Sequence, residues 1–238
     1  FYTCQHREKL PLGILISMHE TDEFTLKCTS LFHEYISINH QADHPLTQGA
    51  NLLETYHQGM PQETETSMAY VSLLVSLYLG LGIDCFRAID YLRKDLDFYE
   101  AKGRLLADEI MGFKEERKDG AIYVLGNGTN IATANQAARM INQRVSLHLQ
   151  GMPLMMFRQT YGDMVENKLL IIIQDNGQWK KDTEIYIELL REQGTHCVFI
   201  EEIDVPWNIS PINLILPFDF AAHYLKRRLN SPHPHLVS

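Results

Sequence analysis

Three short polar segments contain the residue types that bind phosphate or move protons. The first comprises Ser17, His19, Glu20 and Thr21, directly after the apolar run at residues 12–16. Hydroxyls and the free N–H groups at the start of a helix bind phosphate, because these N–H groups lack partners and the helix dipole favours negative charge there. The hydroxyls of Ser17 and Thr21 are therefore candidate phosphate contacts, and His19 and Glu20 lie in the same candidate loop. Ser17 and Thr21 are also common N-cap residues, so a purely structural role stays open.

The second segment is Gly126-Asn127-Gly128, which follows the apolar run at residues 121–125. Glycines let the backbone approach a ligand closely, and a helix is predicted to begin directly after them. The segment lacks the third glycine of a dinucleotide fingerprint and the lysine of a P-loop. We interpret it as a candidate ligand contact, with a simple tight turn as the alternative.

The third segment runs from Glu63 to Ser67, at the start of a long apolar stretch. The helix dipole favours carboxylates in a first turn, and that alone accounts for Glu63. A carboxylate here is also a candidate general base or a ligand for sugar hydroxyls. Thr66 and Ser67 are candidate helix caps or additional phosphate contacts.

Alternating apolar runs and helical patterns must position these segments. Strands are predicted at residues 12–16, 35–39, 51–56, 121–125, 169–174, 197–200 and 213–216, and helices at 23–33, 64–81, 131–148, 180–193 and 218–229. Strands that alternate with helices are typical of a parallel sheet. Ligands bind such sheets beyond the carboxyl ends of the strands, where the first two segments are predicted to lie.

The predicted elements form two successive α/β units. Residues 84–119 are charged, mixed in sign and free of proline, which predicts one or two linking helices. We therefore expect a first domain at 1–83, a helical linker at 84–119 and a second domain at 120–238. The second domain has all the expected elements, whereas the first is expected to lack its N-terminal part.

Composition disfavours several classes of protein. The chain has 238 residues, 45% hydrophobic and 21% charged, as in globular proteins and unlike a disordered chain, a collagen or a coiled coil. No stretch approaches the ~18 apolar residues of a membrane span. The net charge of −9 disfavours a nucleic-acid binder. The four cysteines are far apart and form no metal-ligand cluster, and residues 1–10 lack a signal-peptide core, so a reduced cytoplasmic protein is predicted.

Over nearly the whole chain, the order of these segments resembles the tandem sugar isomerase (SIS) domain family. In that family a strand leads into a Ser-Gln-Ser-Gly-Glu-Thr loop that holds the sugar phosphate, and Ser17, Glu20 and Thr21 match this loop. The segment YVLGNG at 123–128 is similar to the family's strand and Gly-x-Gly turn. The segment NSPHPHL at 230–236 is similar to its closing Asn-Pro-Asp-x-Pro-x-x-Leu segment.

The resemblance implies an α/β fold of two flavodoxin-like units, each a parallel sheet flanked by helices. It implies a phosphorylated sugar or amino sugar as the ligand. It also implies proton transfer next to an open-chain sugar carbonyl, in an isomerase or deglycase that needs no metal or organic cofactor. The expected assembly is a homodimer, without nucleic-acid or membrane partners.

Two positions depart from the synthase-type isomerases of this family. Asn142 stands near the place of the glutamate that moves a proton between two sugar carbons, and Gln159 near that of a histidine that helps to open the ring. An amide cannot act as a general base near pH 7, so each loss would remove a contribution of ~10²–10⁴-fold. Glu63 is then the candidate general base, and His233 or His235 the candidate for ring opening.

Three interpretations of the chain stay open at this point. In the first, the protein is a phosphosugar isomerase or deglycase. In the second, it binds a sugar phosphate without catalysis and regulates a partner, which Asn142 and Gln159 favour. In the third, it is an unrelated flavodoxin-like or nucleotide-binding α/β protein.

Overall fold

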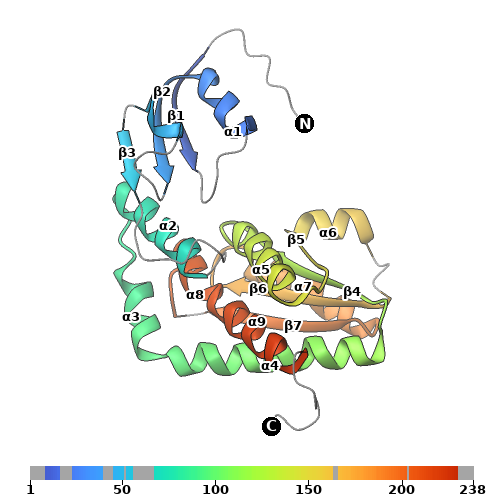
Figure 1. The fold of residues 1–238 in the computed structure, drawn as a ribbon. Coiled ribbons are helices and arrows are strands. Elements are labelled where there is room, and N and C mark those ends of the chain that lie inside the picture. Colours follow the sequence, from blue (N-terminus) through green and yellow to red (C-terminus); the bar gives the residue numbers. More distant parts are fainter. Residues whose placement is uncertain are drawn as a thin grey trace. The chain divides into compact units, whose positions relative to one another are not determined.

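The chain divides into two compact units, Phe1–Thr64 and Glu65–Ser238 (Figure 1). The computed structural model describes residues 9–16, 23–39, 45–50, 52–55, 67–162, 166–202 and 204–229. The domain boundaries expected after residues 83 and 119 stay a prediction. None of the described helices is long and apolar enough to cross a membrane.

The first unit contains a parallel three-stranded sheet of order β1-β2-β3. Its elements are β1 (Leu10–Ile16), α1 (Glu23–Cys28), a 3-10 turn (Thr29–Leu31), β2 (Phe32–Asn39), a second 3-10 turn (Pro45–Thr47) and β3 (Leu52–Thr55). The three predicted strands are confirmed. The helix predicted at 23–33 ends earlier, at Cys28, because β2 begins at Phe32, which pairs with Leu10 of β1.

The second unit contains a parallel four-stranded sheet of order β5-β4-β6-β7. The strands are β4 (Ala121–Gly126), β5 (Leu149–Pro153), β6 (Lys168–Asp175) and β7 (His196–Glu202). The chain passes from β4 to the edge strand β5 and then returns to β6 on the other side of β4. The strand order therefore reverses between β4 and β6, and ligands of open α/β sheets bind at such a reversal.

Helices cover both faces of this second sheet (Figure 1). The helices of this unit are α2 (Ser67–Gly80), α3 (Phe86–Lys94), α4 (Leu96–Glu116), α5 (Asn130–Val145), α6 (Leu154–Tyr161), α7 (Lys180–Glu192), α8 (Pro211–Leu214) and α9 (Leu216–Leu229). Alternate residues of β6 point to opposite faces: Ile171 packs in the core with α4, α5 and α9, and Ile172 in the core with α6 and α7. Burial on both faces explains why β6 is apolar almost throughout.

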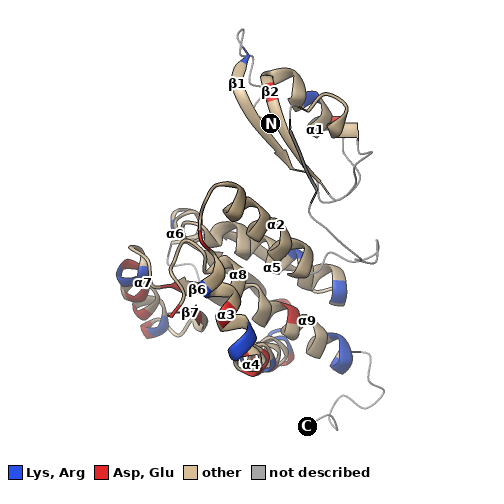
Figure 2. Ribbon diagram, turned by 90° about the vertical axis from the view of Figure 1, so that its left-hand side faces the viewer, with Lys and Arg blue, Asp and Glu red and all other residues tan. Residues whose placement is uncertain are grey.

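The helices differ in their charge. α2 contains no charged residue, whereas α7 carries both acidic and basic side chains (Figure 2). α7 has one apolar side, including Ile187 and Leu190, against the sheet. Its remaining, charged side is consistent with a helix that packs on the sheet with one face only.

The structure differs from the predicted elements in two further places. The strand predicted at 213–216 is wrong: Pro211–Leu214 forms α8, and α9 begins at Leu216. A short buried apolar run cannot be assigned to strand or helix from periodicity alone, and Pro211 favours a helix start. The pair β5 and α6 was not predicted, because the edge strand β5 contains Gly151 and Pro153 and has no continuous apolar run.

Candidate functional site

The predicted phosphate segment directly follows β1. This strand ends at Ile16, the residue before Ser17, so the chain enters the segment from the carboxyl end of a parallel strand. Ligands of open parallel sheets bind beyond that end. The predicted site residues that lie outside the described part of the chain are Ser17, His19, Glu20, Thr21, Glu63, Thr66, His233 and His235. Their roles stay predictions.

A buried polar pair lies at the carboxyl end of the neighbouring strand β2. Ser37 and Asn39 are fully buried, and Asn39 Nδ2 donates a hydrogen bond to Ser37 Oγ at 2.9 Å. β2 pairs with β1 as far as Ile16, which lies opposite Ile38. Polar groups are costly to bury, so two of them at a ligand-binding strand end are candidates for positioning a ligand. The sequence analysis missed them, although polar residues at alternate positions of the segment ISIN were a visible signal.

The glycine segment at 126–128 lies at the carboxyl edge of the second sheet, where the strand order reverses. A Cβ atom at Gly126 would lie 2.2 Å from the carbonyl oxygen of Asn130, so glycine alone lets the chain turn this closely into α5. Gly128 has φ +52°, which also favours glycine. A tight turn therefore accounts for both glycines, and the ligand contacts of Gly126, Asn127 and Gly128 stay a prediction.

Side-chain hydrogen bonds join the loops that follow β4, β6 and β7. Asn127 Nδ2 donates to Thr183 Oγ1 of α7 at 2.9 Å. Asn130 Nδ2 donates to Asp175 Oδ2 at 2.7 Å and lies 3.1 Å from Ser210 Oγ. Asp175, the last residue of β6, is thus a fixed carboxylate at this edge. The sequence analysis missed Asp175, although an acidic residue that ends a buried strand was a usable signal.

A chain of buried polar groups continues inward from this edge. Thr133 Oγ1 donates to Asn130 Oδ1 at 3.2 Å, and the Tyr70 hydroxyl lies 3.2 Å from the same Thr133 oxygen. Burial raises the pKa of Tyr70, and the hydrogen bond with Thr133 lowers it by less. Tyr70 is therefore protonated at neutral pH and can act as a hydrogen-bond donor but not as a base.

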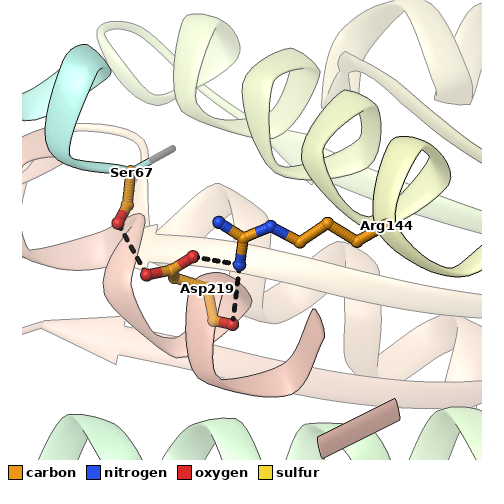
Figure 3. Close-up of polar contacts among 3 residues, drawn as sticks. All are labelled: Ser67, Arg144 and Asp219. Atoms are coloured by element: carbon orange, nitrogen blue, oxygen red, sulfur yellow. Dashed lines mark hydrogen bonds and ion pairs between the residues drawn. The ribbon is translucent and has the colours of Figure 1, made fainter. Parts of the chain in front are cut away.

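Ser67, the first residue of α2, belongs to a network with Asp219 and Arg144 (Figure 3). Ser67 is 4% exposed, and its hydroxyl donates to Asp219 Oδ2 at 2.8 Å. The other carboxylate oxygen of Asp219 forms an ion pair with Arg144. Asp219 lies in the first turn of α9 and Arg144 in the last turn of α5, where the helix dipoles favour these charges. The hydroxyl proton is thus engaged within the second unit, and the proposed phosphate contact of Ser67 stays a prediction.

Asn142 holds the edge strand in place. Its Nδ2 donates to the carbonyl oxygen of Leu149 at 2.8 Å, and its Oδ1 accepts from the Leu149 N–H at 2.7 Å. A glutamate could accept but not donate here, so an amide is the side chain that satisfies both backbone groups of Leu149. Gln159, at the other departure from the family pattern, is exposed on α6.

A buried carboxylate lies at the end of β7. Glu202 is 5% exposed and accepts hydrogen bonds from the Tyr99 hydroxyl and from the Asp204 N–H, the latter at 3.1 Å. Asn213 Nδ2 donates to the same tyrosine oxygen at 2.9 Å. Burial is the main cause that raises the pKa of Tyr99. These bonds satisfy the carboxylate inside the unit, so we assign it a structural role. Within the described ranges, no group of three or more His, Cys, Asp or Glu side chains could hold a metal.

No family model and no curated protein sequence matches the chain. Several solved structures are nevertheless similar to it. The C-terminal domain of glucosamine-fructose-6-phosphate aminotransferase from Francisella tularensis has a TM-score of 0.68 and 13% identity, over 93% of this chain and 73% of that chain. Glucosamine-6-phosphate deaminase from Thermotoga maritima has a TM-score of 0.66 and 14% identity, over 97% and 75%.

Tagatose-6-phosphate ketose/aldose isomerase from Escherichia coli is also similar, with a TM-score of 0.61 and 14% identity, over 95% of this chain and 71% of that chain. Identities of this size concern the fold. All three similarities extend over more than nine tenths of the chain and so include both parallel sheets. The chain therefore has the α/β fold of the phosphosugar isomerases, which confirms the fold predicted from its resemblance to the sugar isomerase domain family.

Proposed function

We propose that the protein binds a phosphorylated sugar beyond the carboxyl edge of its first parallel sheet. One observation carries this proposal: in a chain with the fold of phosphosugar isomerases, β1 ends directly before the segment that contains Ser17 and Thr21. Their hydroxyls hold the phosphate, with support from His19, and Glu20 is a further contact to the phosphosugar. The buried pair at the end of β2, Ser37 and Asn39, borders the same edge of the sheet.

The favoured activity is metal-free proton transfer next to the carbonyl of the open-chain sugar, in an isomerase or deglycase. Glu63 is the general base, and His233 or His235 assists ring opening. Thr66 and Ser67 stay candidate phosphate contacts, although the Ser67 hydroxyl already donates to Asp219. The proposed assembly is a homodimer, and the proposed location is the reducing cytoplasm. Its three described cysteines, Cys28, Cys85 and Cys197, are free thiols.

A second candidate function is phosphosugar binding without turnover, as in a regulatory protein. The hydrogen bonds of Asn142 favour it, because both ends of this amide hold the backbone of Leu149 and neither can take up a proton. Under this alternative the ligand loops are retained, while the proton-transfer groups are not.

Thermal-shift and calorimetric titrations test the proposal. The full chain is titrated with tagatose 6-phosphate, fructose 6-phosphate and glucosamine 6-phosphate, and with the same sugars without phosphate. At 100 times the dissociation constant a ligand stabilises the folded state by about 2.7 kcal/mol. We expect a shift with phosphosugars that is lost in the Ser17→Ala/Thr21→Ala double variant. The control is Ser30→Ala, because Ser30 is exposed in the same unit and its hydroxyl donates to the nearby carbonyl oxygen of Lys27.

Absence of any phosphate-dependent shift contradicts phosphosugar binding. If binding is found, product analysis by NMR separates the two functions. An isomerase or deglycase converts the best ligand and loses at least ~10²-fold in kcat with Glu63→Gln. Binding without conversion, at any ligand tried, supports the regulatory alternative.

A further inference from the structure

The two tryptophans of the chain lie at the carboxyl edge of the second sheet. Trp179 follows β6 and directly precedes α7, and Trp207 lies between β7 and α8. Their exposed fractions are 46% and 49%. Indole side chains bury a large apolar surface when they pack in a core. Two half-exposed indoles on adjacent loops therefore form an apolar surface that the second unit itself leaves uncovered.

Two glycines lie next to the tryptophans. A Cβ atom at Gly128 would lie 3.9 Å from the indole of Trp179, and one at Gly177 would lie 3.1 Å from Trp207 Cβ. The next residue, Thr129, donates from Oγ1 to the carbonyl oxygen of Trp207 at 3.2 Å. The loop after β4 therefore has one tryptophan beside Gly128 and the other beside Thr129, which brings the two aromatic residues to the same loop.

Hydrogen-bond acceptors stand next to these aromatic groups. The Asp175 carboxylate is held by the N–H of Gly177 at 2.8 Å and by Asn130 Nδ2 at 2.7 Å. Each of its oxygens has two lone pairs, so the carboxylate can accept further bonds. The Nδ2 of Asn127 donates to Thr183, and its amide oxygen accepts no hydrogen bond from the residues that the structure describes.

An aromatic surface beside fixed acceptors fits an uncharged sugar ring. The C–H groups on one face of a pyranose are weakly positive and pack against the negative face of an indole. The ring hydroxyls then donate to Asp175 and Asn127. The negative charge of Asp175 would repel the phosphates of a nucleotide. The neighbouring cation, Lys180, is already paired with Glu184 at 3.9 Å. The charges at this edge thus favour a neutral ligand.

We propose that the carboxyl edge of the second sheet is a separate site for an uncharged sugar ring, which stacks on Trp179 or Trp207 and donates hydroxyl bonds to Asp175. This site goes beyond the phosphosugar site proposed for the first unit, because it needs no phosphate and none of the residues Ser17 to Thr21. It gives the protein a way to bind a second sugar or the unphosphorylated part of a larger one.

Intrinsic tryptophan fluorescence tests this site, because the full chain contains no other tryptophan. Titration with glucose, N-acetylglucosamine and maltose is expected to change the emission saturably. In calorimetry, Trp179→Ala or Trp207→Ala is expected to weaken sugar binding roughly tenfold. Trp179→Phe and Trp207→Phe retain an aromatic face and report on the remaining tryptophan. The control is Phe86→Ala, an aromatic residue of α3 that is 64% exposed.

Loss of phosphosugar binding and loss of neutral-sugar binding can be told apart by experiment. The Ser17→Ala/Thr21→Ala double variant is expected to keep the fluorescence response to neutral sugars even if phosphosugar binding is lost or never existed. The tryptophan site is refuted if neutral sugars change neither the emission nor the heat of titration of the folded protein. It is also refuted if the alanine variants bind these sugars as tightly as the unaltered protein does. A third refuting result is an emission that changes with protein concentration but not with sugar, which would indicate that a second copy covers the tryptophans.

Discussion

The network of Ser67, Asp219 and Arg144 makes a quantitative prediction (Figure 3). In the variant Asp219→Ala, the buried Ser67 hydroxyl and the Arg144 guanidinium, whose side chain is 20% exposed, lose their shared partner. Hydrogen bonds to a charged group contribute about 1.5–3 kcal/mol each. Because the Asp219 side chain is itself 31% exposed, water weakens these interactions with its carboxylate. We therefore expect a loss of about 2–3 kcal/mol in the free energy of unfolding.

Thermal denaturation followed by circular dichroism measures this loss. For a chain of this size 1 kcal/mol corresponds to roughly 2–4 °C, so the midpoint is expected to fall by roughly 4–12 °C. The matched control is Asp108→Ala, which breaks an ion pair with Arg228 between α4 and α9. The Asp108 side chain is 48% exposed, and a loss below about 1 kcal/mol is expected.

A double-mutant cycle tests whether the network acts as a unit. Ser67→Ala alone is expected to cost about 1–2 kcal/mol, because the hydroxyl bonds to a charged acceptor. In the Asp219→Ala background the same change should cost at least about 1 kcal/mol less, since its partner is already gone. Additive losses, or an Asp219→Ala variant no less stable than Asp108→Ala, would refute a network in which Ser67 and Arg144 share this carboxylate.

Three further predictions concern the second unit. Gly126→Ala is expected to destabilise by about 2–3 kcal/mol in urea denaturation, because its Cβ would lie 2.2 Å from a backbone oxygen. Gly112→Ala, at an exposed helical position with open space, should instead stabilise by up to about 1 kcal/mol. Asn142→Asp loses the donor to the Leu149 carbonyl oxygen and should cost about 1–3 kcal/mol at pH 7, whereas an unchanged midpoint would contradict its role at the edge strand. Burial raises the pKa of the Cys197 thiol from 9.0 to about 11, so the unfolded chain loses this proton first and stability should fall between pH 9 and 11. This decrease in stability should be smaller in the Cys197→Ala variant. Equal slopes of stability against pH in the two proteins would contradict the role of Cys197.

The sequence alone determined the elements whose signals are local. The run at 169–174 is a strand because continuous apolar residues suit a strand buried on both faces, and β6 confirms it. The amphipathic pattern at 180–193 likewise predicted α7. The order of these elements predicted the parallel α/β fold, and the resemblance of Ser17, Glu20 and Thr21 to a family loop implied a phosphosugar ligand.

Only the tertiary structure decided the features that depend on contacts distant in the sequence. β5 is a strand because it pairs with β4, and Asn142 supports it through backbone groups that no local pattern reveals. Trp179 and Trp207 are far apart in the chain, yet adjacent loops of one sheet edge bring both to the turn after β4. Side-chain convergence of this kind is set by strand order and register, and these are settled when the sheet assembles, not by the neighbours of a residue in the sequence.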